Sequence, residues 1–143
     1  MEIPPLVPEL QVQDLDRSLA FYLETLGFSV AWSRPEEQFA FLRREQAAIM
    51  LEQAEGPGRR ITTGPLEHPF GRGINFQIIA SNVDELAEAI VDTGHELFLP
   101  LEERLVRVGT GHIRLRQFIV SDLDGYLLRF VHPHAPQTST EMD

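Results

Sequence analysis

The sequence contains one pattern twice, and this repeat limits the folds open to the chain. Residues 12–28 read VQDLDRSLAFYLETLGF, and residues 80–96 read ASNVDELAEAIVDTGHE. Each segment begins with an Asx residue suited to an N-cap, Asp14 or Asn82, and continues with apolar residues at helical spacing before a glycine. We therefore predict two copies of one supersecondary unit, each needing the other to bury its apolar face.

Strand-like runs flank both predicted helices in the same order. In the first copy they cover Leu6–Val12 before the helix and Phe28–Ser33, Gln38–Arg43 and Ala47–Gln53 after it; in the second they cover Ile74–Ala80, then Leu97–Leu101, Ile113–Val120 and Tyr126–His132. The pattern predicts an α+β fold of two βαβββ modules. We expect a single domain over residues 1–143, with module one at about 5–53, a linker at 54–73, module two at about 74–132 and a polar tail at 133–143.

The linker is rich in glycine and proline and has no periodicity. A loop of this length inside a compact domain is usually a functional arm or lid, or is disordered. Both alternatives stay open at this point.

Composition excludes several classes of chemistry. The chain has 143 residues, enough for a core, but no cysteine and no lysine. Disulfides, thiolate nucleophiles, Zn–Cys sites, Schiff bases and the P-loop lysine are therefore excluded. No segment is long and apolar enough to span a membrane, and the N-terminus lacks the basic region of a signal peptide, so we expect a cytoplasmic protein.

The formal net charge of −10 bears on the partners. An acidic surface repels phosphate backbones, which argues against nucleic acid as a partner, and it attracts cationic small molecules. The alternative is that the charge serves solubility alone.

Four features together resemble the vicinal-oxygen-chelate superfamily, the glyoxalase and bleomycin-resistance group. They are the paired modules, the openings DLDRSLAFY and NVDEL of the two helices, and the closing SDLDGYLLRF. The resemblance covers about Leu6 to His132 and implies that the modules form a curved mixed sheet with a concave ligand face. It also implies one of two modes of action. Metalloenzyme members carry His or Glu at up to four positions on that face, whereas bleomycin-resistance-like members lack the metal and bind a drug between two subunits.

The residues at those four positions argue against a metal. The matching positions are Val7, Met50, Asn75 and Arg129. Arginine stays protonated and cannot ligate a cation, and divalent metals in such sites prefer carboxylates and neutral imidazoles. None of the five histidines shows the spacing of a metal motif. We therefore predict no metal, no other cofactor and no catalytic residue.

Strand alternation predicts which side chains line the concave face. The polar candidates for ligand binding are Glu9, Glu52, Gln77 and Arg129, with Asn75 beside them. The alternative for Glu52 and Arg129 is that they pair with each other. The aromatic candidates are Trp32, Phe39, Phe41 and Phe118, which suit a planar or cationic ligand, although ordinary core packing is the alternative for each phenylalanine.

The resemblance implies a function as well as a fold. We expect metal-independent binding and sequestration of a small molecule by a homodimer, with a bleomycin-type cationic antibiotic as the candidate ligand and drug resistance as the result. The N-terminal strand, stiffened by Pro4, Pro5 and Pro8, is a candidate for exchange between subunits. The alternatives are a metal-dependent lyase, isomerase or dioxygenase that uses Glu9, Glu52 and a histidine of another chain, and an assembly module whose cup is filled by its own side chains.

Overall fold

The computed structural model describes residues 2–134 and contains both predicted copies of the repeat. The first copy consists of β1 (Glu9–Val12), α1 (Leu15–Ala20), β2 (Ser29–Arg34), β3 (Phe39–Arg44) and β4 (Ala47–Gln53). The second consists of β5 (Asn75–Ile79), α2 (Val83–Asp92), β6 (Leu99–Val108), β7 (Gly111–Ser121) and β8 (Leu127–Pro133). A π-helical turn, η1 (Phe21–Thr25), continues α1, and a 3₁₀ turn, η2 (Pro35–Glu37), joins β2 to β3.

The chain divides into two compact units. Unit 1 comprises the chain up to Gly73 together with Asp122–Tyr126, and unit 2 comprises Ile74–Ser121 and the chain from Leu127 onward. Each unit contains a four-stranded mixed sheet, with strand order β1-β4-β3-β2 in unit 1 and β5-β8-β7-β6 in unit 2. In both sheets the first strand of the module lies parallel to its last strand. These sheets confirm the predicted α+β fold of two βαβββ modules.

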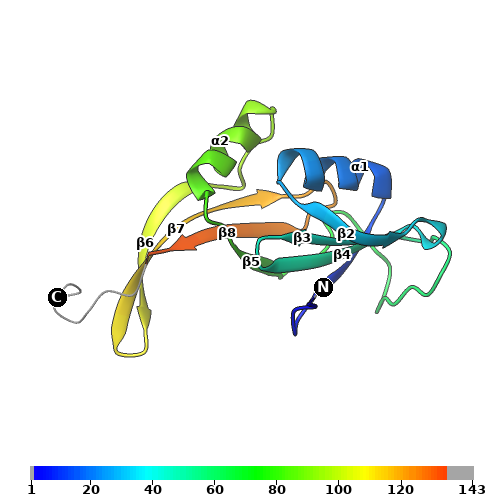
Figure 1. The fold of residues 1–143 in the computed structure, drawn as a ribbon, viewed down its shortest axis with the longest axis horizontal. Coiled ribbons are helices and arrows are strands. Elements are labelled where there is room, and N and C mark those ends of the chain that lie inside the picture. The colour runs from blue at the N-terminus through cyan, green and yellow to red at the C-terminus, as the bar shows by residue number, and fades with distance from the viewer. Residues whose placement is uncertain (1, 135–143) are drawn as a thin grey trace. The chain divides into compact units, whose positions relative to one another are not determined.

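One helix covers one face of each sheet (Figure 1). The Asp14 carboxylate caps α1 by accepting the Arg17 N–H at 3.2 Å. The predicted apolar faces of both helices are confirmed, because Leu15, Tyr22 and Leu26 are buried in the first and Val83, Leu86 and Ile90 in the second. Val91 is 52% exposed and lies outside the buried face of α2.

The sheet of unit 1 has an opposite face that no helix of this unit covers. The Leu15 N–H donates to Gln53 Oε1 at 3.0 Å, so α1 lies on the side of β4 that carries the odd-numbered residues. The even-numbered residues of β4 and their cross-strand partners therefore point the other way. We call this side the helix-free face of unit 1; its residues include Glu9, Gln11, Phe39, Phe41, Met50 and Glu52.

The two motifs that carry the family resemblance meet in the interior of unit 1. Asp122 accepts the Tyr22 hydroxyl at 2.7 Å on Oδ2, and accepts the backbone N–H groups of Asp124 and Tyr126 at 2.9 Å on Oδ1. Burial raises the pKa of Asp122 to about 6, and the three donated hydrogen bonds oppose that rise. The DLDG segment thus contains a buried structural centre, with Asp122 and Asp124 both buried.

Asp124 and Gly125 complete this turn. Asp124 accepts the Gln13 N–H at 2.9 Å and the Ser18 hydroxyl at 3.3 Å. Gly125 adopts a φ of +104°, and a Cβ at this position would lie 2.4 Å from the Pro69 Cβ, so only glycine fits.

Several boundaries differ from the prediction. Strand β1 begins at Glu9 rather than at Leu6, and β6 extends to Val108, well beyond the predicted Leu101. The linker packs within unit 1, since Phe70 is 5% exposed and its N–H donates to the Asp124 carbonyl at 2.7 Å. Residues 135–143 of the predicted polar tail lie outside the described residues. Among the helices that the structure describes, none is long and apolar enough to cross a membrane.

Candidate functional site

A β-bulge places the only tryptophan on the helix-free face of unit 1. In the β2–β3 pairing, Val30 lies opposite Leu42 and Trp32 lies opposite Phe41, so two residues of β2 face one step of β3. If the strand alternated regularly after Val30, Trp32 would point to the same side of the sheet as Val30 and Leu42, and Leu42 packs in the core. The irregularity therefore turns the indole toward the face that carries Phe41.

Three aromatic rings gather on this face, and we call them the aromatic platform: Trp32, Phe39 and Phe41. The indole stacks on Phe41, with ring centroids 5.1 Å apart and an interplanar angle of 15°, and its centroid lies 5.5 Å from that of Phe39. Phe39 and Phe41 are buried, whereas Trp32 is only partly buried. Both phenylalanines therefore pack as a small apolar cluster and also support an accessible indole.

A buried carboxyl group lies beside the platform. Glu52 is 4% exposed and sits opposite Phe39 in the β3–β4 register. Its pKa is raised to about 7, first by burial, then by a hydrogen bond that the protonated Glu52 carboxyl donates to Glu9 and by the charge of Glu9, while Arg60 and Arg34 oppose the rise. Glu52 consequently changes charge near neutral pH.

The two glutamates line a cavity of about 210 Å³, which we call the acid pocket. Its lining consists of Glu9, Arg34, Glu37, Phe39, Glu52, Arg59, Arg60 and Ile61. Carboxylates, guanidinium groups and an aromatic face thus surround one small space within unit 1.

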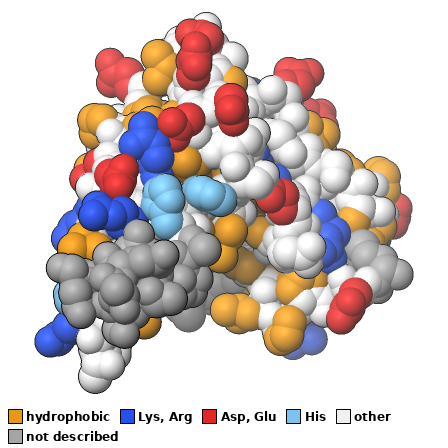
Figure 2. All heavy atoms as spheres, turned by 60° about the vertical axis from the view of Figure 1, so that its left-hand side comes forward, with side chains coloured by type: hydrophobic (Ala, Val, Ile, Leu, Met, Phe, Trp, Pro, Cys, Tyr) orange, Lys and Arg blue, Asp and Glu red, His pale blue; other side chains and the backbone are white. Residues whose placement is uncertain are grey.

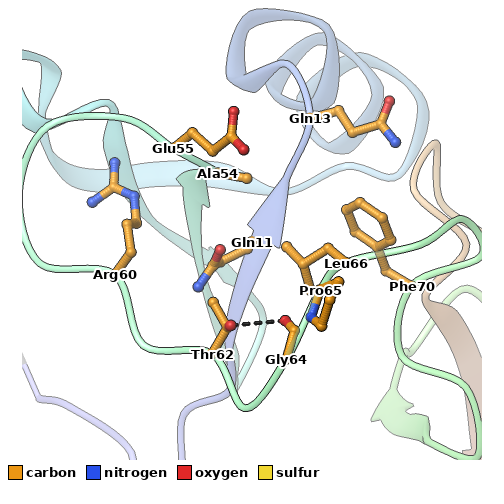
Figure 3. A pocket seen from close by; sticks show the side chains of 10 residues that line it. All are labelled: Gln11, Gln13, Ala54, Glu55, Arg60, Thr62, Gly64, Pro65, Leu66 and Phe70. Carbon is orange, nitrogen blue, oxygen red and sulfur yellow. Dashed lines mark hydrogen bonds between the residues drawn. The ribbon is translucent and has the colours of Figure 1, made fainter.

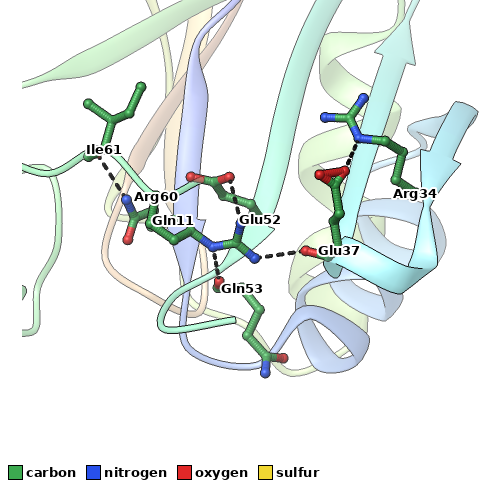
Figure 4. Close-up of polar contacts among 7 residues, drawn as sticks. All are labelled: Gln11, Arg34, Glu37, Glu52, Gln53, Arg60 and Ile61. Carbon is green, nitrogen blue, oxygen red and sulfur yellow. Dashed lines mark hydrogen bonds and ion pairs between the residues drawn. The ribbon is translucent and has the colours of Figure 1, made fainter. Parts of the chain in front are cut away.

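Arg60 fixes the linker against this pocket (Figure 4). Its Nε donates to the Gln53 carbonyl and one terminal nitrogen donates to the Glu37 carbonyl, both at 2.7 Å. The other terminal nitrogen lies 3.3 Å from Glu52 Oε2, and the Arg60 side chain is 13% exposed. Beside it, the Gln11 side-chain amide donates to the Ile61 carbonyl at 3.0 Å. These contacts make Arg60 a structural clamp that holds the pocket wall.

Arg34 makes a different set of contacts. Its guanidinium carbon lies 4.1 Å from the Phe39 ring centroid and 5.3 Å from that of Trp32. Its Nε donates to Glu37 Oε2 at 2.6 Å, and the side chains of both residues remain substantially exposed. A planar cation of the protein itself therefore rests on the aromatic platform.

A larger cavity of about 440 Å³ is bounded by the end of β1 and by the linker (Figure 3). It is lined by Gln11, Gln13, Ala54, Glu55, Arg60, Thr62, Gly64, Pro65, Leu66 and Phe70. Its polar side chains include two amides and a hydroxyl, whereas the buried Glu52 carboxyl group and the Phe39 ring line the acid pocket. Because Arg60 lines both cavities, they adjoin.

Polar candidates of the second module form a hydrogen-bonded group within unit 2. Arg129 Nε donates to Asn75 Oδ1 at 3.0 Å, and one terminal nitrogen lies 3.1 Å from Gln77 Oε1 and 3.3 Å from Gln117 Oε1. Arg129 thus has its partners within unit 2, and Glu52 has its ion-pair partner, Arg60, within unit 1. A ligand-binding role for Gln77 and Arg129 stays a prediction.

Phe118 lies on the other side of its strand from this group. It is fully buried and stacks on Phe130, its cross-strand partner, with centroids 5.4 Å apart. Gln117 and Arg129, the chain neighbours of this pair, point to the opposite face of the sheet. Phe118 therefore packs in the core of unit 2, which was the alternative to ligand binding for each phenylalanine, and it is not part of the proposed site.

The residues at the implied metal positions do not suit a divalent cation. Val7 and Met50 pack against the aromatic cluster of unit 1, and in unit 2 the Arg129 guanidinium donates to Asn75 itself. Aliphatic, thioether, amide and guanidinium groups do not form the carboxylate–imidazole set that such metals prefer. Within residues 2–134, no three His, Asp or Glu side chains are grouped so as to hold a metal ion.

Three residues of the site were not predicted from the sequence. Arg34, Glu37 and Arg60 contact the predicted candidates, but the sequence places them only in a strand end, a turn and an aperiodic loop. The available signal was weak: the SRP tripeptide at 33–35 marks a turn immediately after Trp32. Nothing local indicates that Arg60 folds back onto β4.

Acidic side chains are scattered over the face shown in Figure 2 and do not gather in a single patch. The net charge of −10 is summed over the whole sequence. A field of this kind raises the local concentration of cations around the molecule.

Comparison with known proteins gives a family model and several solved structures. The model described as the Glyoxalase/Bleomycin resistance protein/Dioxygenase superfamily matches residues 4–130. TioX from Micromonospora sp. ML1 is 25% identical with a TM-score of 0.66, over 89% of this chain and 96% of that chain. Virulence protein STM3117 from Salmonella typhimurium is 23% identical with a TM-score of 0.68, over 92% and 98%.

An integron cassette protein from V. cholerae is 21% identical with a TM-score of 0.68, over 92% of this chain and 97% of that chain. At this identity and at that of the virulence protein, the likeness concerns the fold alone. A search of curated proteins gave no match.

Proposed function

Because the chain belongs to the glyoxalase/bleomycin resistance protein/dioxygenase superfamily, we propose that it binds a small molecule without a metal ion, on the helix-free face of unit 1. The proposed ligand is a cationic aromatic compound, with bleomycin-type antibiotics as the model, and the proposed role is sequestration that confers resistance. One observation carries the proposal: a partly buried indole is stacked on Phe41 and lies beside Phe39, which is the cross-strand neighbour of the buried Glu52.

Two physical effects favour a cation at this position. The faces of aromatic rings carry negative electrostatic potential, and tryptophan attracts cations most strongly. A carboxylate held out of water interacts with an opposite charge more strongly than an exposed one does. Glu52 and Phe39 line the acid pocket, and the Trp32 ring lies beside Phe39 with centroids 5.5 Å apart, so both effects act at this position.

The size of the cavities bears on the ligand. Pockets for drug-sized molecules are usually about 300–1,000 Å³. The acid pocket, at about 210 Å³, accepts only part of such a molecule, and the adjoining cavity of about 440 Å³ offers room for the rest. We therefore propose that the charged aromatic portion of the ligand enters the acid pocket.

Replacing Trp32 with alanine is expected to weaken the binding of metal-free bleomycin about tenfold, because stacking on an aromatic cation is lost. Isothermal titration calorimetry on both proteins measures this change. The matched control is Phe98→Ala, which removes an aromatic ring that is 66% exposed in unit 2, and it should bind as the unaltered protein does. An unchanged heat signal in Trp32→Ala would contradict the assignment of the aromatic platform.

The enzymatic alternative is tested on the same preparations. A lyase, isomerase or dioxygenase of this superfamily needs a divalent metal, so elemental analysis after purification without chelators distinguishes the two functions. Stoichiometric nickel, zinc, manganese or iron would favour the enzyme. We expect sub-stoichiometric metal, and bleomycin binding that a chelator does not change.

We also propose that the protein is a homodimer that uses its N-terminal segment in the contact. Leu6 is 83% exposed and Ile3 is 58% exposed, while the Pro8 carbonyl accepts the Met50 N–H at 2.8 Å and so ties the end of this segment to β4. Light scattering after size-exclusion chromatography should give twice the 16.2 kDa mass of one chain, and Leu6→Glu should shift the population toward the monomer. A monomeric mass for the unaltered protein at high concentration would refute the dimer.

A further inference from the structure

The Arg34 guanidinium lies on the ring faces that the proposed function assigns to the ligand. It is centred 4.1 Å above Phe39 and also approaches the Trp32 ring, and it pairs with Glu37. Resting on the proposed function, we infer that Arg34 is an internal competitor that marks a seat for a planar cation. The ligand class assigned to that seat is a compound bearing a guanidinium or amidinium group, which displaces Arg34.

Arg34 is held weakly enough to be displaced. Its side chain is 44% exposed and that of Glu37 is 38% exposed, and their ion pair joins residues three apart in sequence. Exposed ion pairs of this kind contribute little to the stability of the fold, and exposed cation–π contacts make only a modest further contribution. Arg60 contrasts with it, because that side chain is 13% exposed and makes contacts to Gln53, Glu37 and Glu52.

The backbone that carries Glu37 is held by contacts that do not involve Arg34. Pro35 opens the 3₁₀ turn that carries Glu37, and Gln38 closes the turn with a φ of +52°. The Arg60 guanidinium also donates to the Glu37 carbonyl at 2.7 Å, which fixes the backbone of the turn. When the Arg34 side chain leaves, the Glu37 carboxylate therefore remains beside the platform to pair with the incoming cation.

The chemistry of the seat favours planar over compact cations. A guanidinium or amidinium group presents parallel N–H donors to a carboxylate and a flat face to an aromatic ring, which an ammonium group does not. The exchange replaces one planar cation by another, so the charge of the pocket is unchanged. Flatness and the paired donors are then the properties for which the site selects.

The test uses benzamidinium as the probe and two single-arginine variants. Arg34→Gln and Arg17→Gln each remove one positive charge from unit 1, but Arg34 lines the acid pocket and contacts the aromatic rings, whereas Arg17 is an exposed residue of α1. Titration of the full chain is followed by ¹H–¹⁵N NMR at pH 8.5, where Glu52 is ionised. The Nε–H signal of Arg34 in the unaltered protein reports loss of its hydrogen bond to Glu37.

We expect Arg34→Gln to bind benzamidinium about three- to tenfold more tightly, because the competing internal contacts are gone. Arg17→Gln should change the affinity less than twofold, and the Arg34 Nε–H signal should shift during titration of the unaltered protein. Equal tightening in both variants would reduce the effect to long-range charge, and weaker binding by Arg34→Gln would make Arg34 a ligand contact. Either result overturns the inference, as does absence of binding by Arg34→Gln.

A third variant separates this inference from the proposed function. If benzamidinium binding is lost in Trp32→Ala but unaffected by Arg34→Gln, the ligand site stands and the role of Arg34 is wrong. If Trp32→Ala binds benzamidinium and bleomycin as the unaltered protein does, the proposed site itself is wrong. If the unaltered protein binds bleomycin but not benzamidinium, and Trp32→Ala binds neither, the proposed site stands and the assignment of the amidinium class is wrong.

Discussion

Replacing Asp122 with alanine is expected to lower the free energy of unfolding by about 3–5 kcal/mol, the largest stability loss we expect from one substitution. The Asp122 side chain accepts two backbone N–H groups and the Tyr22 hydroxyl, and both residues are buried. Alanine leaves all three donors without this acceptor, and each unsatisfied buried donor costs about 1–3 kcal/mol. The loss therefore arises from unpaired groups more than from the volume removed.

Urea unfolding, followed by the far-ultraviolet circular dichroism signal, measures the change. The control is Glu88→Ala, which removes one carboxylate from an exposed position of α2 and should alter stability by less than about 0.5 kcal/mol. If Asp122→Ala does not fold, Tyr22→Phe removes only the hydroxyl donor and should lower stability by about 1–3 kcal/mol. A loss in Tyr22→Phe no larger than in the control would show that this buried hydrogen bond does not stabilise the fold.

This structural centre explains why two separated motifs identify the family. The segment around Ser18 and Tyr22 and the segment around Asp122 and Asp124 are about a hundred residues apart in sequence, yet their side chains bond directly. Both motifs are therefore signals of fold more than of chemistry. The repeat, the buried helix faces and the succession of strands and helices along the chain follow from local patterns, because periodicity and capping are properties of neighbouring residues.

The site depends on features that local patterns do not encode. The face of Trp32 is set by the bulge after Val30, and alternation alone places the indole with Leu42 in the core. The face of Phe118 is set by its pairing with Phe130, a register that neither strand specifies by itself. Arg60 reaches Glu52 because an aperiodic linker folds back onto its own sheet. Local patterns therefore predict the helices and strands, but they do not predict side-chain faces and contacts that depend on strand register or loop conformation.

Replacing Glu52 with glutamine is expected to stabilise the protein at pH 8 and to weaken its binding of a cationic ligand. The pKa of Glu52 is raised from its ordinary value to about 7, first by burial and then by Glu9. Between pH 4.5 and 7 the folded state thus binds more protons than the unfolded state, and the stability from this group is lost as the pH rises. Glutamine resembles the protonated acid at every pH, so the variant avoids that loss.

The sign of the effect decides between a structural and a functional role. Thermal unfolding at pH 5 and pH 8 should show a stability difference that grows by about 1–3 kcal/mol in favour of Glu52→Gln at the higher pH. If the Arg60 ion pair were the reason for an acid at this position, glutamine would be less stable at pH 8 and the difference would have the opposite sign. A residue that lowers stability when charged is typical of functional sites.

Binding should change in the opposite direction. At pH 8 we expect Glu52→Gln to bind metal-free bleomycin about thirtyfold more weakly, since a buried opposite charge is removed, and at pH 5 the two proteins should differ little because Glu52 is then protonated. Glu36→Gln removes an exposed carboxylate from the turn η2 and is the matched control, for which affinity should change less than twofold. A uniform loss at both pH values would mean that the glutamate side chain contributes shape, not charge, and would remove the electrostatic basis of the site.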